Sequence, residues 1–456
     1  MEKMKTGKYI LGVTTLIALC FMLSCKRDTS TYVKSNVAKI TAFKFVAVDS
    51  IPGLGAAKFV VEELNDTGLI YNTDSIKYGT PLNKVRPYFN YYSYPSAVAI
   101  KWGKDSTYWL TTYTGSSDTL DFTTGKPMTV TVISEDQSKR KVYKFKVVAH
   151  QADPNLMRWT EQDNEVYSPA ANDEQRLLVF GSNLWLFVSN GTNTESMYSV
   201  NDGATWVPAT VNQPKAECKV SNIFVLGDKM HYVDGKDLYT SLDGESWSVE
   251  TATIDVDTLT YLFSWADRAV LAGYRTDKSK CIIILQDGQL IDKNIKLSSN
   301  FPHSEFAATV FNSTSLRPRA IVLGGRDKDG DILNGCWNFE YLPANDSLRI
   351  QDYAVGRTMR KISATAVVWY DNKLMRFGGI DEAGRLDSAI YVSNNEGLSW
   401  SIADTASIKL PDGYGRRQKI SAVAYDKDIF LFGGHTADAT KADLWQGRIN
   451  SADWTK

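Results

Sequence analysis

The sequence predicts an all-β protein in which a β-sandwich is followed by a six-bladed β-propeller. The chain of 456 residues contains 23 Tyr, 18 Phe and 12 Trp, and such side chains favour pleated strands. Short apolar segments alternate with Gly, Asn and Asp turns, which is typical of strands joined by tight turns. Beyond residue 155 a unit of about 40–55 residues recurs, and recurrence at this scale indicates blades or stacked repeats in place of one core.

The composition limits the classes of partner that we expect. Hydrophobic residues make up 43% and charged residues 23% of the chain, which is typical of a folded globular protein. Lys and Arg total 51 against 52 Asp and Glu, which gives a net charge of −1. Because this balance provides no basic field, nucleic acid is not an expected partner.

Residues 1–24 are predicted to be a signal peptide and not part of the fold. A lysine-containing start precedes an apolar stretch, residues 9–23, that is short for a membrane-spanning helix. The end of the stretch and the two residues after it read Met22-Leu23-Ser24-Cys25, which resembles the lipobox of bacterial lipoproteins. The resemblance implies that Cys25 is acylated and anchors the protein to the bacterial envelope, in particular to the outer membrane. In the alternative interpretation the segment is an ordinary secretory signal and Cys25 has no special role.

A polar tether and a first domain are expected to follow. Residues 25–36 are rich in Ser, Thr and charged residues, which predicts the tether. Residues 37–150 are predicted to form a β-sandwich, because strand-like alternation recurs along them. Residues 128–134 and 141–148 flank a polar turn and predict a hairpin. The segment resembles the Ig-like or cadherin-like modules that follow the tether in many bacterial surface lipoproteins.

Residues 155–456 are the segment predicted to form the β-propeller. Its later repeats contain pairs of glycines at the end of an apolar strand. Such pairs allow positive φ angles or a close approach of two backbones. The segments around them resemble kelch repeats, in which a double glycine ends the second strand of a four-stranded blade. The glycines assigned to this structural role are Gly324, Gly325, Gly378, Gly379, Gly433 and Gly434.

Three further segments share a hydroxyl residue, a glycine and a tryptophan in register, at residues 199–206, 240–247 and 393–400. They resemble the Asp-box, which shapes the turn between the last two strands of a propeller blade. Polar side chains in such a segment can bond the backbone of a tight turn, and the tryptophan can pack between sheets. The residues expected to serve the fold in this way are Ser199, Gly203, Trp206, Gly244, Trp247, Gly397 and Trp400.

Both signatures, together with degenerate copies between them, predict about six four-stranded blades that close into a ring. Closure removes the exposed edge strands that an open array would leave. Two segments could supply the joining strand, residues 157–159 at the start of the unit or residues 453–454 at its end. The sequence leaves both possibilities open.

Residues that commonly carry chemistry do not gather into a known motif. The four histidines are scattered singly without metal-ligand spacing, and we assign no cofactor, metal or catalytic residue. Residues 327–331 alternate Asp with other residues around a glycine, as in some calcium sites, but an acidic solvated turn explains them equally well. Cys218, Cys281 and Cys336 are expected to be unpaired core thiols.

The resemblance to Asp-box propellers raises an enzyme hypothesis. Such propellers include sialidases and related glycosidases, which need several arginines for the substrate carboxylate and a tyrosine nucleophile with a nearby acid. The early Arg-Ile-Pro segment of those families is absent, and Arg317-Pro-Arg319 is the nearest string. A glycan-active hydrolase at the cell surface is therefore the alternative function.

Polar loops follow the second strand of successive units, and a closed ring would place them on one face around the central channel. Function is often carried by loops on a rigid scaffold, although ordinary solvated turns would have the same composition. These loops predict a lipid-anchored envelope protein that binds a glycan or a protein ligand at this face. The candidate contact residues are Arg275, Asp277, Arg326, Asp327, Asp329, Asp381, Arg385 and His435.

Overall fold

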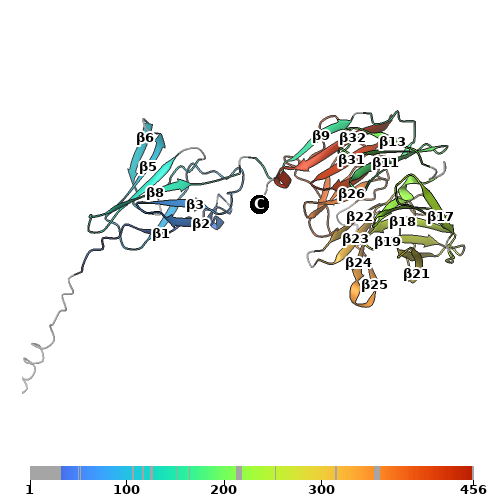
Figure 1. Cartoon of the computed structure of the whole chain (residues 1–456), viewed down its shortest axis with the longest axis horizontal. Coiled ribbons are helices and arrows are strands. Elements are labelled where there is room, and N and C mark those ends of the chain that lie inside the picture. The colour runs from blue at the N-terminus through green and yellow to red at the C-terminus, as the bar shows by residue number, and fades with distance from the viewer. Residues whose placement is uncertain are drawn as a thin grey trace, which may run out of the picture. The chain divides into compact units, whose positions relative to one another are not determined.

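The computed structural model describes residues 32–453, apart from 50, 52, 105–106, 116–117, 124–126, 151, 164, 212–217, 252, 314–315 and 354–359. The expected signal peptide, Cys25 and most of the expected tether lie outside the described residues. The chain divides into two compact units, Met1–Gln151 and Ala152–Lys456 (Figure 1). In the described part of the chain, strands dominate, and none of its helices is long and apolar enough to cross a membrane.

The first unit consists of two sheets around one core. Strands β1 and β4 form the smaller sheet, and the larger has the order β2-β3-β8-β7-β5-β6, with β3 and β8 parallel. The predicted hairpin is confirmed, because β7 and β8 pair antiparallel. The bounds are β1 Ile40–Phe45, β2 Phe59–Glu63, β3 Thr67–Asn72, β4 Pro87–Tyr91, β5 Ala97–Lys104, β6 Thr107–Thr112, β7 Met128–Ile133 and β8 Arg140–Lys146.

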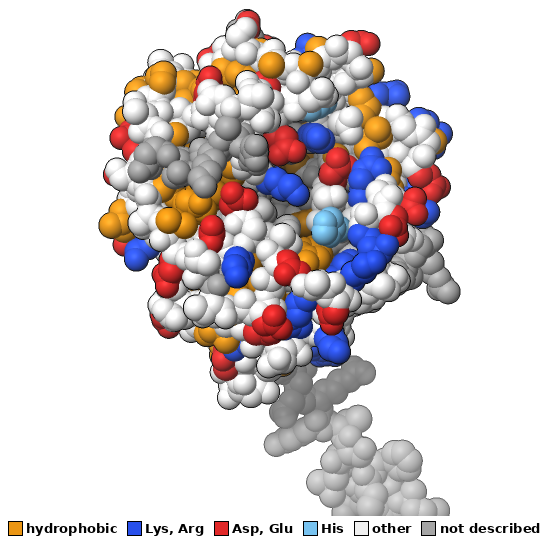
Figure 2. All heavy atoms as spheres, turned by 90° about the vertical axis from the view of Figure 1, so that its right-hand side faces the viewer, with side chains coloured by type: hydrophobic (Ala, Val, Ile, Leu, Met, Phe, Trp, Pro, Cys, Tyr) orange, Lys and Arg blue, Asp and Glu red, His pale blue; other side chains and the backbone are white. Residues whose placement is uncertain are grey.

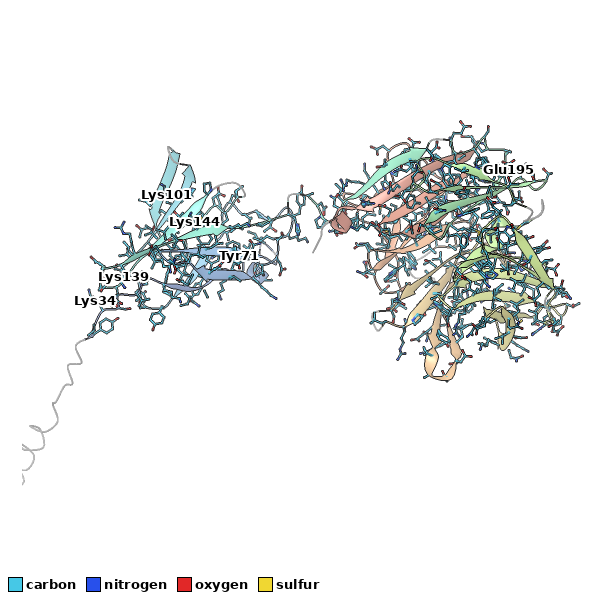
Figure 3. All side chains as sticks on the ribbon, in the orientation of Figure 1. Lys34, Tyr71, Lys101, Lys139, Lys144 and Glu195 are labelled. Carbon is cyan, nitrogen blue, oxygen red and sulfur yellow. The ribbon has the colours of Figure 1, made fainter. Side chains whose placement is uncertain are left out.

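Phenylalanines fill the space between these two sheets. The ring centroid of Phe43 on β1 lies 4.8 Å from that of Phe59 on β2 and 5.0 Å from that of Phe145 on β8. Both contacts are edge-to-face, a geometry that aromatic pairs favour. On the outer face of the larger sheet, Lys101 on β5 and Lys144 on β8 are exposed (Figure 3). Alternation along each strand thus separates the aromatic core from the solvent face.

The described residues of the second unit form six four-stranded sheets, which confirms the predicted all-β fold with a propeller. Five sheets are meanders of consecutive strands, and we call them blades 1 to 5; blade 6 has the order β30-β31-β32-β9. The bounds in blades 1 to 3 are β10 Glu174–Phe180, β11 Asn183–Ser189, β12 Thr194–Ser199, β13 Val207–Ala209; β14 Ile223–Leu226, β15 Lys229–Asp234, β16 Asp237–Ser241, β17 Trp247–Thr251; β18 Thr258–Ser264, β19 Arg268–Tyr274, β20 Lys280–Gln286, β21 Gln289–Lys296. Those in blades 4 to 6 are β22 Ala307–Asn312, β23 Pro318–Leu323, β24 Cys336–Leu342, β25 Ser347–Asp352; β26 Ala366–Tyr370, β27 Lys373–Phe377, β28 Tyr391–Ser393, β29 Ser401–Ile402; β30 Ser421–Tyr425, β31 Asp428–His435, β32 Thr440–Ile449 and β9 Met157–Asp163.

The ring is closed by a strand from the start of the unit. Strand β9 pairs antiparallel with β32 and becomes the fourth strand of blade 6. Of the two candidate joining segments, residues 157–159 therefore take this role. Asp453 belongs to a short 3₁₀ helix, Asn450–Asp453, and Trp454 lies outside the described residues. The first strands are neighbours around the axis in the order β10, β14, β18, β22, β26, β30 and back to β10.

The three segments that end in tryptophan form the turn between the third and fourth strands of blades 1, 2 and 5. In the first and third segments, the leading serine Oγ accepts a hydrogen bond from the glycine N–H four residues later, at 3.0 and 2.9 Å. In the second, Ser241 takes this position in place of Thr240 and accepts the N–H of Gly244 at 2.9 Å. This turn is one residue shorter, so the hydroxyl groups of the three segments are not in strict register.

The tryptophans of these segments lie between neighbouring blades. Trp206 packs with residues of blades 6 and 1, Trp247 with blades 1 and 2, and Trp400 with blades 4 and 5. Gly203 lies against the preceding blade so closely that a Cβ atom would come within 2.0 Å of Leu444 Cδ2. Each segment therefore joins two blades as well as shaping a turn.

The glycine pairs also link successive blades. Gly325 N–H donates to the carbonyl oxygen of Ile362 in blade 5, and Gly379 N–H to that of Arg417 in blade 6, both at 2.9 Å. At the next interface, Gly434 N–H donates to the side-chain Oε1 of Gln175 in blade 1, at 2.8 Å. All six glycines of the three pairs have positive φ, which explains why this residue type recurs at these positions.

Candidate ligand site at the centre of the propeller

A cavity of about 510 Å³ lies at the centre of the ring. All six blades line it, each through its first strand or through the segment that leads into this strand. The volume falls within the range of about 300–1,000 Å³ that is typical of small-molecule sites. Figure 2 shows a face of this unit on which charged and histidine side chains surround a central depression. The charged and histidine residues that line the cavity are Glu174, Arg176, Lys219, His303, Glu305 and Lys419.

Three equivalent residues of blades 4, 5 and 6 form a rim at this cavity. Glu305, Ala364 and Lys419 have φ angles of 52°, 51° and 55°, a left-handed conformation that residues other than glycine seldom adopt. Ala364 N–H donates to the carbonyl oxygen of Glu305 at 2.8 Å, and Lys419 N–H to that of Ala364 at 2.7 Å. Backbone strain of this kind persists where the surroundings enforce it. The rim thus presents a carboxylate, a methyl group and an ammonium group from fixed positions.

The polar loops after the second strands of blades 4, 5 and 6 lie beside this rim. Each loop forms a β-bridge to the segment leading into the first strand of its own blade, and the paired residues are Arg326 with Ser304, Ile380 with Ser363, and His435 with Gln418. Because Ser304 lines the cavity, the first of these loops pairs with a segment that lines the cavity.

The loop of blade 4 binds one of the cavity carboxylates. Arg326 Nε donates to Glu305 Oε2 at 2.6 Å, and Arg326 Nη1 donates to the carbonyl oxygen of Gly330 at 2.8 Å. Asp327 Oδ1 accepts the N–H groups of Asp329 and Asp331, each at 2.9 Å. Backbone hydrogen bonds, first that of Asp331, lower the pKa of Asp327. The Asp327 carboxylate therefore shapes the turn, and the described residues contain no cluster of three potential metal ligands.

The loops of blades 5 and 6 use their candidate residues mainly for internal contacts. Asp381 is buried, and its Oδ1 accepts the N–H of Ala383 and of Arg385, each at 2.9 Å. The hydrogen bond from the Arg385 backbone is the main cause that lowers the pKa of Asp381. The Arg385 side chain is 71% exposed, and its Nε donates to Asp381 Oδ2 at 2.9 Å. His435 is buried, and its Nε2 lies 2.8 Å from the carbonyl oxygen of Asp173.

In the loop of blade 3 the candidate residues also bond other groups of the protein. Arg275 Nε donates to the carbonyl oxygen of Asp255 at 2.9 Å, and the guanidinium forms an ion pair with Asp292. Asp277 Oδ1 accepts the N–H of Ser279 at 2.9 Å and so closes the turn. A contact between these loop residues and a ligand stays a prediction.

The charged residues that line the cavity are not among the contact residues predicted from the sequence. Arg176 lies on β10, the first strand of blade 1, and is followed by apolar residues. The sequence signal for it was an arginine directly before the apolar residues of a first strand, where Arg176 is partly buried. Lys219, His303 and Lys419 precede first strands, in connections whose length varies from blade to blade. Their position became visible only once the ring had fixed which segments face the axis.

The pairing that the glycosidase alternative needs is not formed by the described lining residues. The hydroxyl oxygen of Tyr261, the tyrosine in the lining, accepts a hydrogen bond from Ser264 at 3.2 Å. Glu305 is bonded to Arg326.

The three cysteines are free and buried, and burial raises the pKa of Cys218 and Cys336 to about 12. These thiols are therefore not poised as nucleophiles.

Comparison with known families places the chain. A family described as the DUF6242 beta propeller domain matches residues 153–456, and the DUF6242 N-terminal domain matches residues 26–147. The chain belongs to the DUF6242 family. A solved structure of YjhT matches with 9% sequence identity and a TM-score of 0.46, over 61% of this chain and 95% of YjhT. Among curated proteins, none matches the DUF6242 chain significantly.

Proposed function

We propose that the protein is a lipid-anchored binding protein of the cell envelope that holds a small ligand, or the end of a glycan or peptide chain, in its central cavity. The observation that carries the proposal is the cavity of about 510 Å³ to which all six blades contribute. Polar and charged groups lie beside aromatic and aliphatic ones, including Tyr261, Phe263 and Phe306. This mixture is typical of sites that orient a ligand by a few polar contacts and bury the rest of it.

The binding test uses residues 26–456 and arrays of glycans and peptides. Ala422 lines the cavity, so Ala422→Trp should fill part of it and weaken binding of any captured ligand. The matched control is Ala204→Trp, at an exposed position of the turn before β13, which should bind as the unchanged chain does. If both variants bind a ligand equally well, the binding site lies outside the cavity.

The lipid anchor rests on the lipobox-like sequence at Cys25 and has a separate test. Cells that express the full chain are given a radiolabelled fatty acid, and the protein is recovered from membranes. The label should be lost in Cys25→Ser. If Cys25→Ser still carries the label, the anchor is elsewhere.

Two carboxylates in the cavity, Glu174 and Glu305, keep a glycan-active hydrolase as the second candidate. Chromogenic glycosides would detect it directly with residues 26–456. Turnover that is lost in Glu174→Gln would replace the binding function with catalysis.

A further inference from the structure

We infer that Arg176 is the anion-binding residue of the central cavity and that the ligand carries a carboxylate or another oxyanion. The inference rests on the proposed binding function and adds the chemical class of the ligand.

The buried arginines of the described propeller, Arg268, Arg376 and Arg417, have carboxylate partners. Arg417 forms a bidentate pair with Asp443, at 2.5 and 2.8 Å. Arg376 Nη2 lies 2.7 Å from Asp387 Oδ2, and Arg268 pairs with two aspartates. These pairs follow the general rule that a buried charge is compensated.

Arg176 departs from this rule. It lines the cavity, and its buried Nε has no hydrogen-bond partner. Among the described residues, no carboxylate lies within ion-pair distance of its guanidinium. Burial lowers the pKa of Arg176, yet an arginine in a protein stays protonated. A positive charge with unused donors therefore lies at the cavity.

An aromatic ring lies beside this guanidinium. The Arg176 Cζ atom lies 5.9 Å from the centroid of the Tyr261 ring. The Tyr261 ring stacks on Phe224 with centroids 4.3 Å apart and ring planes 4° apart. The cation therefore sits beside a fixed surface from blades 2 and 3. A cation placed in this way can meet a ligand with little reorganisation.

The remaining charges of the lining also favour an anion. Lys219 and Lys419 add two positive groups, whereas Glu305 is already bonded to Arg326. Glu174 is the one other acid of the described lining. A guanidinium suits a carboxylate or a phosphate, because its N–H groups match two oxygens at once. With the size of the cavity, this charge distribution fits an acidic sugar or a sugar phosphate.

The test measures binding to residues 26–456 at constant ionic strength, by calorimetry and by the shift of the thermal unfolding midpoint. Glucuronate, glucose 6-phosphate and glucose are the probes, which share one ring and differ in the charged group. Glucuronate or glucose 6-phosphate should bind and raise the midpoint, and the stronger of the two identifies the oxyanion. If both acids bind no better than glucose, the inference is overturned.

Variants then assign the effect to Arg176. Arg176→Met should weaken binding of the acidic probe about tenfold to hundredfold, the range expected for losing charge-assisted hydrogen bonds. Arg349→Met is the control, because Arg349 is exposed on the outer strand β25. This variant should bind the acidic probe with unchanged affinity. Equal losses in the two variants would contradict a specific role for Arg176.

The unliganded protein supplies a second readout that needs no probe. Arg176 is partly buried, its Nε has no hydrogen-bond partner and its charge has no carboxylate partner, so an apolar side chain in its place should raise the unfolding midpoint of Arg176→Met. A lower midpoint would assign Arg176 to the fold and overturn the inference. If Arg176→Met binds array ligands as the unchanged chain does while Ala422→Trp does not, this inference fails and the proposed function stands. If no array ligand binds at all, the proposed function itself fails.

Discussion

Gly378 and Gly384 both have positive φ, but they differ in what surrounds them. A Cβ atom on Gly378 would lie 2.4 Å from the carbonyl oxygen of Arg417, whereas one on Gly384 would meet nothing within 4 Å. Each Gly→Ala change adds a left-handed backbone penalty of about 1–2 kcal/mol. Gly378→Ala should lose about a further 1–3 kcal/mol through the clash. Urea unfolding of the two variants measures the difference, and equal stabilities would contradict the blade contact.

A second residue-scale prediction concerns His231, which is buried on β15. Its Nδ1 lies 3.0 Å from Thr240 Oγ1, and its ring stacks on Phe224. Burial, with a smaller contribution from Lys229, lowers the pKa of His231 to about 4. The unfolded chain then binds more protons at His231 than the folded one does between about pH 6.5 and pH 4.

The sign of the pH effect follows from this difference. The stability contribution of neutral His231 is complete above about pH 6.5 and is lost as the pH falls toward 4, by up to about 3 kcal/mol. His231→Gln should flatten the fall in unfolding free energy of the propeller over this window. The control is His150→Gln, in the first unit, which should leave the propeller transition unchanged. A propeller with the same slope in His231→Gln would disprove the assignment.

At the scale of the strand, the Gln175 side chain takes the place of a backbone carbonyl acceptor at the interface between blades 6 and 1. Gly325 and Gly379 donate to carbonyl oxygens of the next blade, but Gly434 donates to Gln175 Oε1. Gln175 Nε2 also donates to the carbonyl oxygen of Lys441 at 2.6 Å. Blade 1 therefore joins blade 6 through a side chain on β10.

Replacing this side chain should weaken ring closure. Gln175→Met removes the acceptor of Gly434 N–H and should reduce the unfolding free energy by about 1–3 kcal/mol. Gln289→Met, at an exposed position on β21, should change it by less than about 0.5 kcal/mol. Denaturant midpoints of both variants give the comparison. Similar values for the two would mean that Gln175 does not stabilise the interface.

Local signals made the blades predictable, and long-range pairing did not follow from them. The positive φ angles of the glycine pairs and the turns that end in tryptophan depend on residues that are close together in the sequence. These features therefore predicted strands and turns in the right order. In the second turn, Thr240 was predicted to provide the leading hydroxyl group, but Ser241 provides it. The two residues are adjacent and both carry a hydroxyl group. Strand β9 pairs with β32 from the other end of the unit. That choice depends on which sheet edge stays open, which no local pattern encodes.

At the scale of the whole molecule, the site depends on the ring more than on any motif. Arg176 and Tyr261 come from blades 1 and 3, yet they meet at the axis. The sequence predicted polar loops around a channel, and several of those loops lie beside the cavity rim. It could not tell that Asp381 and His435 would be buried. Whether a polar loop residue faces solvent or closes its own turn is decided by the neighbouring segments.

Each of the two units should fold independently when it is expressed alone, because every hydrophobic cluster consists of residues from a single unit. Of the clusters formed by the described residues, one lies in the first unit and six lie in the second. Chains 26–151 and 152–456 should each unfold cooperatively, at the denaturant midpoints of the corresponding transitions of chain 26–456. Chain 165–456 is the control, since it lacks β9 and leaves β32 as an unpaired edge. It should unfold at a lower midpoint than chain 152–456 or aggregate. Equal midpoints for chains 152–456 and 165–456 would mean that β9 does not hold the ring closed.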